Sequence, residues 1–206
     1  MNRAKGALFK RSFEADRIAS MNIQTPGIAL RTADDFLAWN EGREGRREFV
    51  DGRIVEMMTG VSKNHNRVAT NLLLLLGSRL DRHRYDIGTA DYAVRTKAGV
   101  RYPDLYIEEK GTDGAALSTE APILVAEILS PSSLAIDFGP KVTEYISIPS
   151  LRIYLVLSQD EPRAWIWNRE ENGFVGPDIL FGINEQITLG AFDLRVPLAD
   201  LYHDVA

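Results

Sequence analysis

The chain has 206 residues, 45% of them apolar and 26% charged, with no cysteine and a formal net charge of −5 at pH 7. This length and composition are typical of one globular domain with a full core, and they exclude a low-complexity protein, a disulfide framework and a thiolate metal site. We therefore expect a cytoplasmic protein. The acidic balance gives no overall attraction to nucleic acid. No apolar run approaches the length of about 20 residues that a membrane span needs, so we expect no membrane association.

A polar, basic extension is expected at residues 1–27, ending at Pro26-Gly27, and we expect it to be partly flexible. Its basic residues are not followed by an apolar stretch, so the sequence does not predict a secretory signal. Because the rest of the chain contains no internal repeat and no composition break, residues 28–206 are expected to form a single domain.

Two short elements are predicted after this extension. Thr32 and Asp35 have the spacing of a capping box, which predicts the start of a short helix. Asp51-Gly52 lies between the extended segments 48–50 and 53–55, and this dipeptide favours a β-hairpin with a two-residue type I′ turn.

A long helix is predicted next, with Ser62 as its N-cap and an end near Arg82. Its apolar side chains are Val68, Leu72, Leu73, Leu74, Leu75, Leu76 and Leu80. Because these positions cover a wide part of the helix surface, we expect the helix to be well buried.

The second half of the chain reads mainly as strands. The expected elements are extended segments at 85–95, 102–108, 123–130 and 151–157, a turn-rich link at 111–119, a helix from Asp137 or Pro140 to Ile148, and an antiparallel pair at 163–168 and 174–179. Because a helix connects 123–130 to 151–157, we expect these two strands to belong to one sheet. The order of elements predicts a mixed α/β domain with a central sheet.

An acid interrupts the most apolar extended run of the chain. Glu127 lies inside Ile123–Ser130, where an ionised carboxylate without compensation is costly, so it should be paired, protonated or bound to a metal. Asp104 occupies a similar place on the strand-like segment upstream. If both carboxylates lie on one face, a hard cation such as Mg²⁺ relieves their repulsion. The alternatives are a turn role for Asp104 and a buried arginine partner for Glu127, with Arg101 or Arg152 as candidates.

Several motifs together resemble a known family. They are Pro103-Asp104 followed by the Glu127 strand, Glu48–Met57, Val125–Ser132, and Lys141–Tyr145 before Leu151–Val156. They resemble the Uma-type restriction-endonuclease-like family of bacterial proteins, within the PD-(D/E)XK nuclease superfamily. The resemblance covers roughly residues 30–202.

The resemblance implies a restriction-endonuclease-like α/β fold: a mixed sheet flanked by helices, with an N-terminal hairpin and additional C-terminal strands. It also implies a nuclease that hydrolyses phosphodiester bonds of nucleic acid with Mg²⁺ or Mn²⁺. Asp104 and Glu127 would be catalytic residues and the metal ligands. DNA is favoured over RNA as the partner, and a homodimer is expected because nucleases of this fold often use two sites.

One position departs from the superfamily pattern, which expects a lysine two residues after the second acid. Leu129 occupies that position, and Lys141 on the following helix is the natural catalytic substitute. The alternative for Lys141 is an ion pair with Asp137 one helical turn away, worth only about 0.3–0.5 kcal/mol. A vestigial site is the corresponding alternative for the whole protein, which would then be a non-catalytic module that binds nucleic acid or protein.

Four further residues are candidates at the site. Glu48 matches an additional N-terminal acid that can contact the metal or its waters, although a solvated hairpin acid is the competing interpretation. His65 is assigned to substrate binding, with an ordinary helix-surface histidine as the alternative. Ser130 follows the Glu127 strand and is also assigned to substrate binding. Asp91 is either a further ligand or a partner of Arg95.

Arginines near the predicted hairpin could give a local basic surface despite the acidic net charge. They are Arg43, Arg46, Arg47 and Arg53. The alternative is a solvated charged face without a binding role.

Overall fold

The computed structural model describes residues 30–57, 60–130 and 134–205. The expected extension at 1–27 therefore lies outside the described residues. The elements are α1 (Ala33–Asn40), β1 (Arg47–Val50), β2 (Arg53–Glu56), α2 (Lys63–Arg79), β3 (Tyr85–Thr89), β4 (Ala93–Thr96), β5 (Gly99–Arg101), β6 (Leu105–Glu109), β7 (Ser118–Thr119), β8 (Pro122–Leu129), α3 (Leu134–Asp137), α4 (Pro140–Ile146), β9 (Ile153–Ser158), β10 (Arg163–Glu170), β11 (Gly173–Phe181), β12 (Gln186–Leu189), the 3₁₀ helix η1 (Gly190–Phe192), β13 (Leu194–Pro197) and α5 (Leu198–Leu201).

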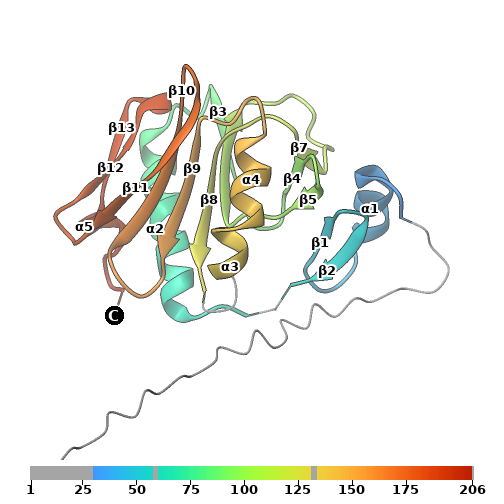
Figure 1. Cartoon of the computed structure of the whole chain (residues 1–206), viewed down its shortest axis with the longest axis horizontal. Coiled ribbons are helices and arrows are strands. Elements are labelled where there is room, and N and C mark those ends of the chain that lie inside the picture. The colour runs from blue at the N-terminus through green and yellow to red at the C-terminus, as the bar shows by residue number, and fades with distance from the viewer. Residues whose placement is uncertain (1–29, 58–59, 131–133, 206) are drawn as a thin grey trace, which may run out of the picture.

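The central sheet contains six strands in the order β11-β10-β9-β8-β6-β3. The β8 and β9 strands run parallel, and the other neighbouring pairs are antiparallel. Because α3 and α4 connect β8 to β9, the predicted helical crossover is confirmed. In Figure 1, α2 covers one face of this sheet and α3 and α4 lie on the other.

Alternation along β8 divides the core into two layers. Leu124, Ala126 and Ile128 pack in the same cluster as the buried residues of α2. Val125 and Leu129 pack in the cluster that contains Tyr145 of α4. Side chains of a strand alternate between the two faces of a sheet, so Glu127 belongs to the face covered by α4.

A second sheet in the order β2-β1-β5-β4-β7 holds the N-terminal hairpin. The predicted capping box of α1 is present, since the Thr32 side chain accepts from the Asp35 backbone N–H and the Asp35 carboxylate accepts from that of Thr32. The predicted hairpin turn is also present: Asp51 and Gly52 have φ values of 48° and 76°, as a type I′ turn requires. Phe36 of α1 stacks on Phe49 of β1, with 5.5 Å between ring centroids.

Several predicted boundaries were wrong. The α2 helix ends at Arg79 rather than near Arg82, because Leu80 is already in an extended conformation as its C-cap. Leu74 is 64% exposed, so the apolar face of α2 is narrower than the leucine run suggested. The extended segment expected at 85–95 is two strands, since a turn separates β3 from β4.

The C-terminal residues form a small unit beside the central sheet. The β12 and β13 strands pair with each other, and α5 follows them. The Asn71 side chain of α2 donates to the carbonyl oxygens of Leu201 and His203, at 2.9 and 3.0 Å. These bonds and the shared apolar cluster attach the C-terminal unit to α2. Within the described residues, no helix combines the length and the apolar character that crossing a bilayer demands.

The tryptophans of β10 contribute to the core. Trp167 is buried and packs against Tyr154, with 5.3 Å between ring centroids. Trp165 is half-buried and meets Phe138 edge to face at 4.9 Å. Core packing therefore accounts for Trp167 in full.

Gly99 allows β5 to approach β1, the strand that carries Glu48. It has a φ of +148°, and a Cβ there would lie 2.0 Å from the carbonyl oxygen of Phe49. A Gly99→Ala variant is expected to lose about 1–3 kcal/mol of its free energy of unfolding, because backbone must move to remove that clash. Urea denaturation followed by circular dichroism measures this loss. Gly114→Ala is the matched control, because no heavy atom lies within 4 Å of its added Cβ and its stability should be close to wild type.

Candidate active site

The strand register brings Asp104 and Glu127 together. The pairing of β6 with β8 matches Leu105 with Ala126 and Tyr106 with Val125, so Asp104, one residue before β6, lies opposite Glu127. Directly opposed residues of an antiparallel pair point to the same face, with Cβ atoms about 4.5–5.5 Å apart. The backbone N–H of Ile128 donates to Oδ2 of Asp104 at 2.8 Å, which holds this carboxylate against the β8 strand.

Glu127 is buried and has two partners on α4. Lys141 Nζ lies 2.8 Å from Oε1 of Glu127, and the Tyr145 hydroxyl donates to the same oxygen at 3.0 Å. Lys141 and Tyr145 are four residues apart, so one face of α4 presents both groups to the acid. Burial raises the pKa of Glu127 to about 8, and the Lys141 ammonium acts in the opposite direction.

Lys141 has a second carboxylate partner. Its Nζ lies 3.0 Å from Oδ1 of Asp137, which is also buried. This is an ion pair without hydrogen-bond geometry, since neither carboxylate oxygen of Asp137 has a hydrogen-bond partner in the part of the chain that the structure describes. Burial disfavours the charged amine, but the facing carboxylates, Glu127 first, outweigh it and raise the pKa of Lys141. Lys141 therefore makes the ion pair with Asp137 that was the alternative interpretation, and it also contacts Glu127.

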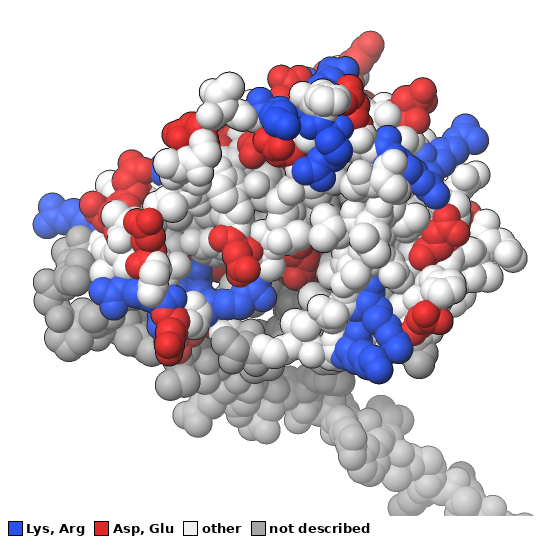
Figure 2. All heavy atoms as spheres, turned by 180° about the vertical axis from the view of Figure 1, so that it is seen from behind, with Lys and Arg blue, Asp and Glu red and all other residues white. Residues whose placement is uncertain are grey.

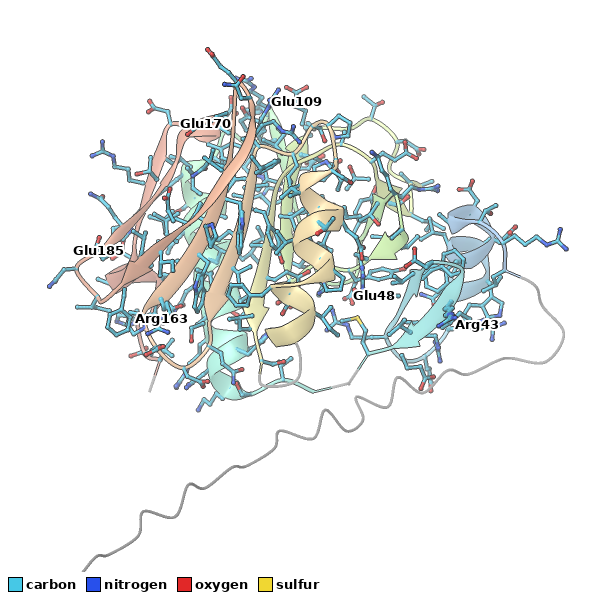
Figure 3. The ribbon with its side chains drawn as sticks, in the orientation of Figure 1. Arg43, Glu48, Glu109, Arg163, Glu170 and Glu185 are labelled. Atoms are coloured by element: carbon cyan, nitrogen blue, oxygen red, sulfur yellow. The ribbon has the colours of Figure 1, made fainter. Side chains whose placement is uncertain are left out.

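Glu48 is 3% exposed, so the interpretation as a solvated hairpin acid was wrong. Arg101 donates from Nη1 to Oε2 of Glu48 at 2.6 Å, and the backbone N–H of Tyr102 donates to Oε1 at 3.3 Å. Arg101 also donates to Glu144 of α4, from Nε to Oε2 at 2.8 Å and from Nη2 to Oε1. This arginine therefore ties the β1 strand to α4, and in Figure 3 Glu48 lies between the hairpin and α4.

His65 is also buried, so the helix-surface interpretation was wrong. Its Nε2 lies 3.3 Å from Oδ2 of Asp104. The first turn of α2 fixes its backbone, because the Ser62 side chain accepts from the His65 N–H at 3.1 Å. Ser130 directly follows β8 and is half-buried, and its assignment to substrate binding stays a prediction.

The donor groups fit a hard divalent cation in type and number. Asp104 and Glu127 supply two carboxylates on one face, and Mg²⁺ is usually held by one or two carboxylates together with waters and substrate phosphate oxygens. Across residues 30–57, 60–130 and 134–205, no group of three or more histidine, aspartate or glutamate side chains is placed to hold an ion. An ion held by these two carboxylates would therefore take its remaining ligands from water and substrate oxygens rather than from further protein side chains.

Sequence reasoning missed Tyr145 and Glu144 as parts of this site, and it named Arg101 only as an alternative partner of Glu127. A buried arginine in a strand signals a missing counter-charge, but the alternative in which Arg101 or Arg152 pairs with Glu127 was wrong. Arg101 binds Glu48 and Glu144 instead, and Lys141 is the cation at Glu127. Asp91 does not pair with Arg95, which contacts Asp34 and Glu120.

With this geometry established, comparison with known proteins gives the family. A family model described as "Uma2: Putative restriction endonuclease" matches residues 33–196. The chain belongs to the Uma2 family. Two uncharacterized proteins of Synechocystis sp. are similar to this Uma2 chain: one is 33% identical over 135 residues, covering 63% of this chain and 76% of the relative. The other is 30% identical over 143 residues, covering 68% of this chain and 75% of the relative.

A solved structure supports the fold of this Uma2 protein. The crystal structure of a "putative nuclease belonging to DUF820" from Anabaena variabilis superposes with a TM-score of 0.70 at 14% sequence identity. The match covers 85% of this chain and 99% of the other. The expected restriction-endonuclease-like fold, with a mixed sheet flanked by helices, is therefore confirmed.

The Uma2 site also explains the departure at Leu129. Leu129 is buried in the cluster that contains Tyr145 and Val156, so its side chain contributes to the core. Lys141 of α4 contacts the carboxylate of Glu127, two residues before Leu129.

Proposed function

We propose that this Uma2 protein is a nuclease that hydrolyses phosphodiester bonds of nucleic acid with the help of Mg²⁺ or Mn²⁺. The observation that carries the proposal is the opposition of Asp104 and Glu127 across β6 and β8, with the Lys141 amine 2.8 Å from Glu127. Two carboxylates on one face with an adjacent cation match the needs of phosphodiester hydrolysis, in which negative charge develops on phosphate oxygens.

Asp104 and Glu127 are the proposed metal ligands. The bound ion would polarise the scissile phosphate and lower the pKa of a water molecule. The backbone N–H of Ile128 and the imidazole of His65 orient the Asp104 carboxylate. The Tyr145 hydroxyl orients Glu127 by donating to its Oε1 at 3.0 Å.

Lys141 is the proposed group that positions the attacking water and offsets charge on the phosphate. Its pKa is raised by the surrounding carboxylates, so it acts as a cation rather than as a base at neutral pH. Glu48 is the proposed acid that accepts from the water around the metal, and Arg101 holds it in place. His65 and Ser130 are the proposed substrate contacts.

The direct test is cleavage of DNA and RNA, single-stranded and duplex, with Mg²⁺ or Mn²⁺. Asp104→Asn is expected to lower the cleavage rate at least about 100-fold, as removal of a catalytic group typically does. Asp178→Asn on the exposed face of β11 is the control and should cleave like wild type. Equal cleavage by wild type and Asp104→Asn would disprove the proposal, and so would cleavage that persists in excess chelator.

The second candidate is a non-catalytic module that binds nucleic acid or protein on the same fold. It is favoured by Leu129 in the core and by the contact of Lys141 with Asp137, which gives the lysine a structural role. Thermal denaturation with Mn²⁺ separates the two. A working metal site raises the melting temperature of wild type but not of Glu127→Gln, whereas a vestigial site gives no shift in either protein.

Further parts of the proposal concern partner, assembly and location. The proposed substrate is DNA rather than RNA, and the proposed active form of the protein is a homodimer. The absence of cysteine agrees with the proposed cytoplasmic location. Figure 2 shows a face on which Lys and Arg side chains are interspersed with Asp and Glu. Along this face, local groups rather than one broad basic surface would have to hold the nucleic acid.

A further inference from the structure

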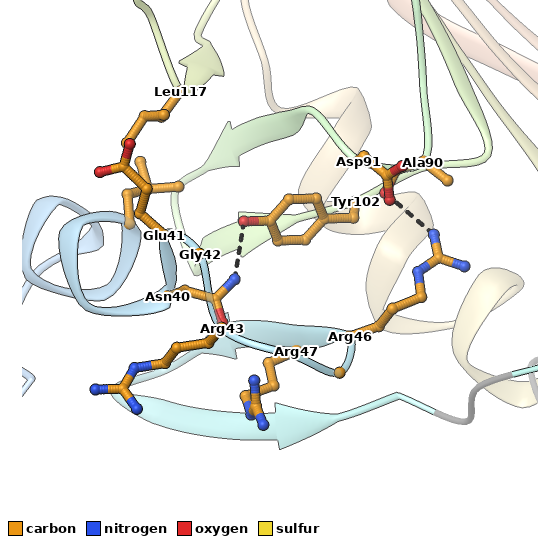
Figure 4. Close-up of a pocket in the computed structure, with 12 residues that line it drawn as sticks. Asn40, Glu41, Gly42, Arg43, Arg46, Arg47, Ala90, Asp91, Tyr102 and Leu117 are labelled. Atoms are coloured by element: carbon orange, nitrogen blue, oxygen red, sulfur yellow. Dashed lines mark hydrogen bonds between the residues drawn. The ribbon is translucent and has the colours of Figure 1, made fainter.

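The N-terminal module consists of α1, β1 and β2, residues 33–56. A cavity of about 290 Å³ lies at the junction of this module and the central part of the protein. Figure 4 shows Tyr102 at its centre, the α1–β1 segment on one side and the turn after β3 on the other. Asn40, Arg43, Arg46, Arg47 and Asp91 are among the lining residues. Its volume is close to the lower end of the range of about 300–1,000 Å³ that is usual for small-ligand sites.

Tyr102 connects this cavity to the proposed metal site. Its side chain lines the cavity, while its backbone N–H donates to Oε1 of Glu48 at 3.3 Å. Only Pro103 separates it from Asp104. A strand whose scissile phosphate lies at Asp104 would therefore have a neighbouring nucleotide within reach of the cavity.

Two lining residues carry buried polar atoms that have no hydrogen-bond partner among the described residues. They are Oδ1 of Asn40 and Nη1 of Arg47. The amide nitrogen of Asn40 is already directed to the Tyr102 hydroxyl at 3.4 Å. Arg47 lies 3.7 Å from Glu56 through Nε, and its guanidinium lies 5.7 Å from the centroid of the Trp39 ring. Both residues line the cavity, and buried polar atoms are normally satisfied, so a ligand that offers a donor and an acceptor would satisfy these two atoms once the side chains turn toward it.

The charge of the lining favours the neutral base of a nucleotide over a simple anion. The lining contains Arg43, Arg46 and Arg47 together with Glu41 and Asp91, so its positive excess is small. Arg46 is partly used, because its Nη2 donates to the Ala90 carbonyl at 3.1 Å. A bare phosphate would meet two carboxylates here, whereas a base is neutral and presents donors and acceptors side by side.

An unpaired base fits these groups better than a paired one. The Watson–Crick edge of a base carries a donor beside an acceptor, and in a duplex this edge is occupied by the opposite strand. Aromatic rings and guanidinium planes are the surfaces on which proteins stack unpaired bases. Tyr102 supplies a ring in the cavity, and the Arg43 guanidinium already lies 4.5 Å from the centroid of the Trp39 ring.

We infer that this cavity binds one unpaired nucleotide next to the scissile phosphate, with Asn40 and Arg47 contacting the base edge and Tyr102 its face. The inference rests on the proposed nuclease function for its biological meaning. It gives the enzyme a preference for single-stranded or locally unpaired substrate, and it assigns the preference to residues outside the metal site.

The test is binding of a fluorescently labelled single strand of about ten nucleotides, as DNA and as RNA, measured by anisotropy in excess chelator. The same sequence as a blunt duplex is measured beside it. Asn40→Leu, which keeps the side-chain shape without its polar atoms, is expected to weaken single-strand binding about 10-fold and to leave duplex binding unchanged. A second variant, Arg43→Ala, is compared with Arg53→Ala, because both remove one arginine of the N-terminal module and only Arg43 lines the cavity.

The inference is supported if Asn40→Leu loses single-strand affinity and if Arg43→Ala loses more of it than Arg53→Ala does. The support applies to DNA, to RNA or to both, according to which single strand shows these losses. Unchanged binding of both strand types in Asn40→Leu overturns it, and so does an equal loss in the two arginine variants. Because the assay contains chelator, it does not depend on the metal. A failed cleavage assay with intact, Asn40-dependent binding would therefore reject the proposed nuclease and keep the nucleotide site.

Discussion

Replacing Lys141 with methionine is expected to lower the free energy of unfolding by about 3–5 kcal/mol above about pH 8, where Glu127 is ionised in the wild type, because removal of one member of a buried ion pair leaves uncompensated charge. Glu127 and Asp137 both contact this amine, at 2.8 and 3.0 Å. Both carboxyl groups are buried, so water does not replace the lost cation. Such a loss is a large part of the total stability of about 5–15 kcal/mol that is usual for a domain.

The loss should depend on pH in a defined direction. Without the ammonium, the folded-state pKa of Glu127 rises further above its ordinary value of 4.5. The folded protein then binds more protons than the unfolded chain. The loss of unfolding free energy caused by Lys141→Met is therefore smallest below about pH 4.5, and it grows as the pH rises toward the folded-state pKa of Glu127. Urea titrations of variant and wild type across this range measure the difference.

Two controls separate the structural and catalytic roles of Lys141. Lys97→Met removes an exposed lysine from the turn between β4 and β5 and should leave stability within about 0.5 kcal/mol of wild type. Lys141→Met combined with Asp137→Asn should recover part of the stability, because one buried charge is gone. If cleavage returns together with stability, Lys141 acts only as a structural counter-ion, whereas a lasting loss supports its role at the phosphate.

Affinity for Mg²⁺ is expected to rise as the pH increases from about 6.5 to about 8.5, by up to about tenfold per pH unit below the pKa of Glu127. Burial raises that pKa to about 8, while Lys141 lowers it and Asp137 and Asp104 raise it further. A carboxyl group must lose its proton to bind the ion, so binding at neutral pH should release a proton. Calorimetry in two buffers of different ionisation enthalpy measures the affinity and counts the protons.

His65 provides the control for the pH dependence, because its imidazole contacts Asp104, the other proposed metal ligand. A His65→Asn variant should retain the pH profile if Glu127 is the titrating group, and Glu127→Gln should lose both the profile and most of the affinity. An affinity that stays constant across this pH range, or a profile that disappears with His65, would contradict the assignment to Glu127.

Local features of the fold were predicted well because their causes are local. Asp51 and Gly52 adopt the positive φ angles of the turn, and Thr32 and Asp35 form the capping box, through contacts within a few residues. The exposed Leu74 shows where such reasoning fails. Periodicity identifies apolar positions on a helix, but the neighbouring elements decide how wide a face they cover.

Sequence patterns were enough to predict that Glu127 is buried in a strand and needs a partner, that Asp104 is its candidate companion, and that Leu129 replaces the lysine of the superfamily pattern. Which groups meet depends on the packing of distant elements. The pairing of β6 with β8 set the two acids opposite each other, and the packing of α4 brought Lys141 and Tyr145 to Glu127. Arg101 and Glu48 are 53 residues apart, and Asn40 and Tyr102 are 62 apart. No local preference encodes such contacts, because strand register and helix docking follow from how the whole core packs.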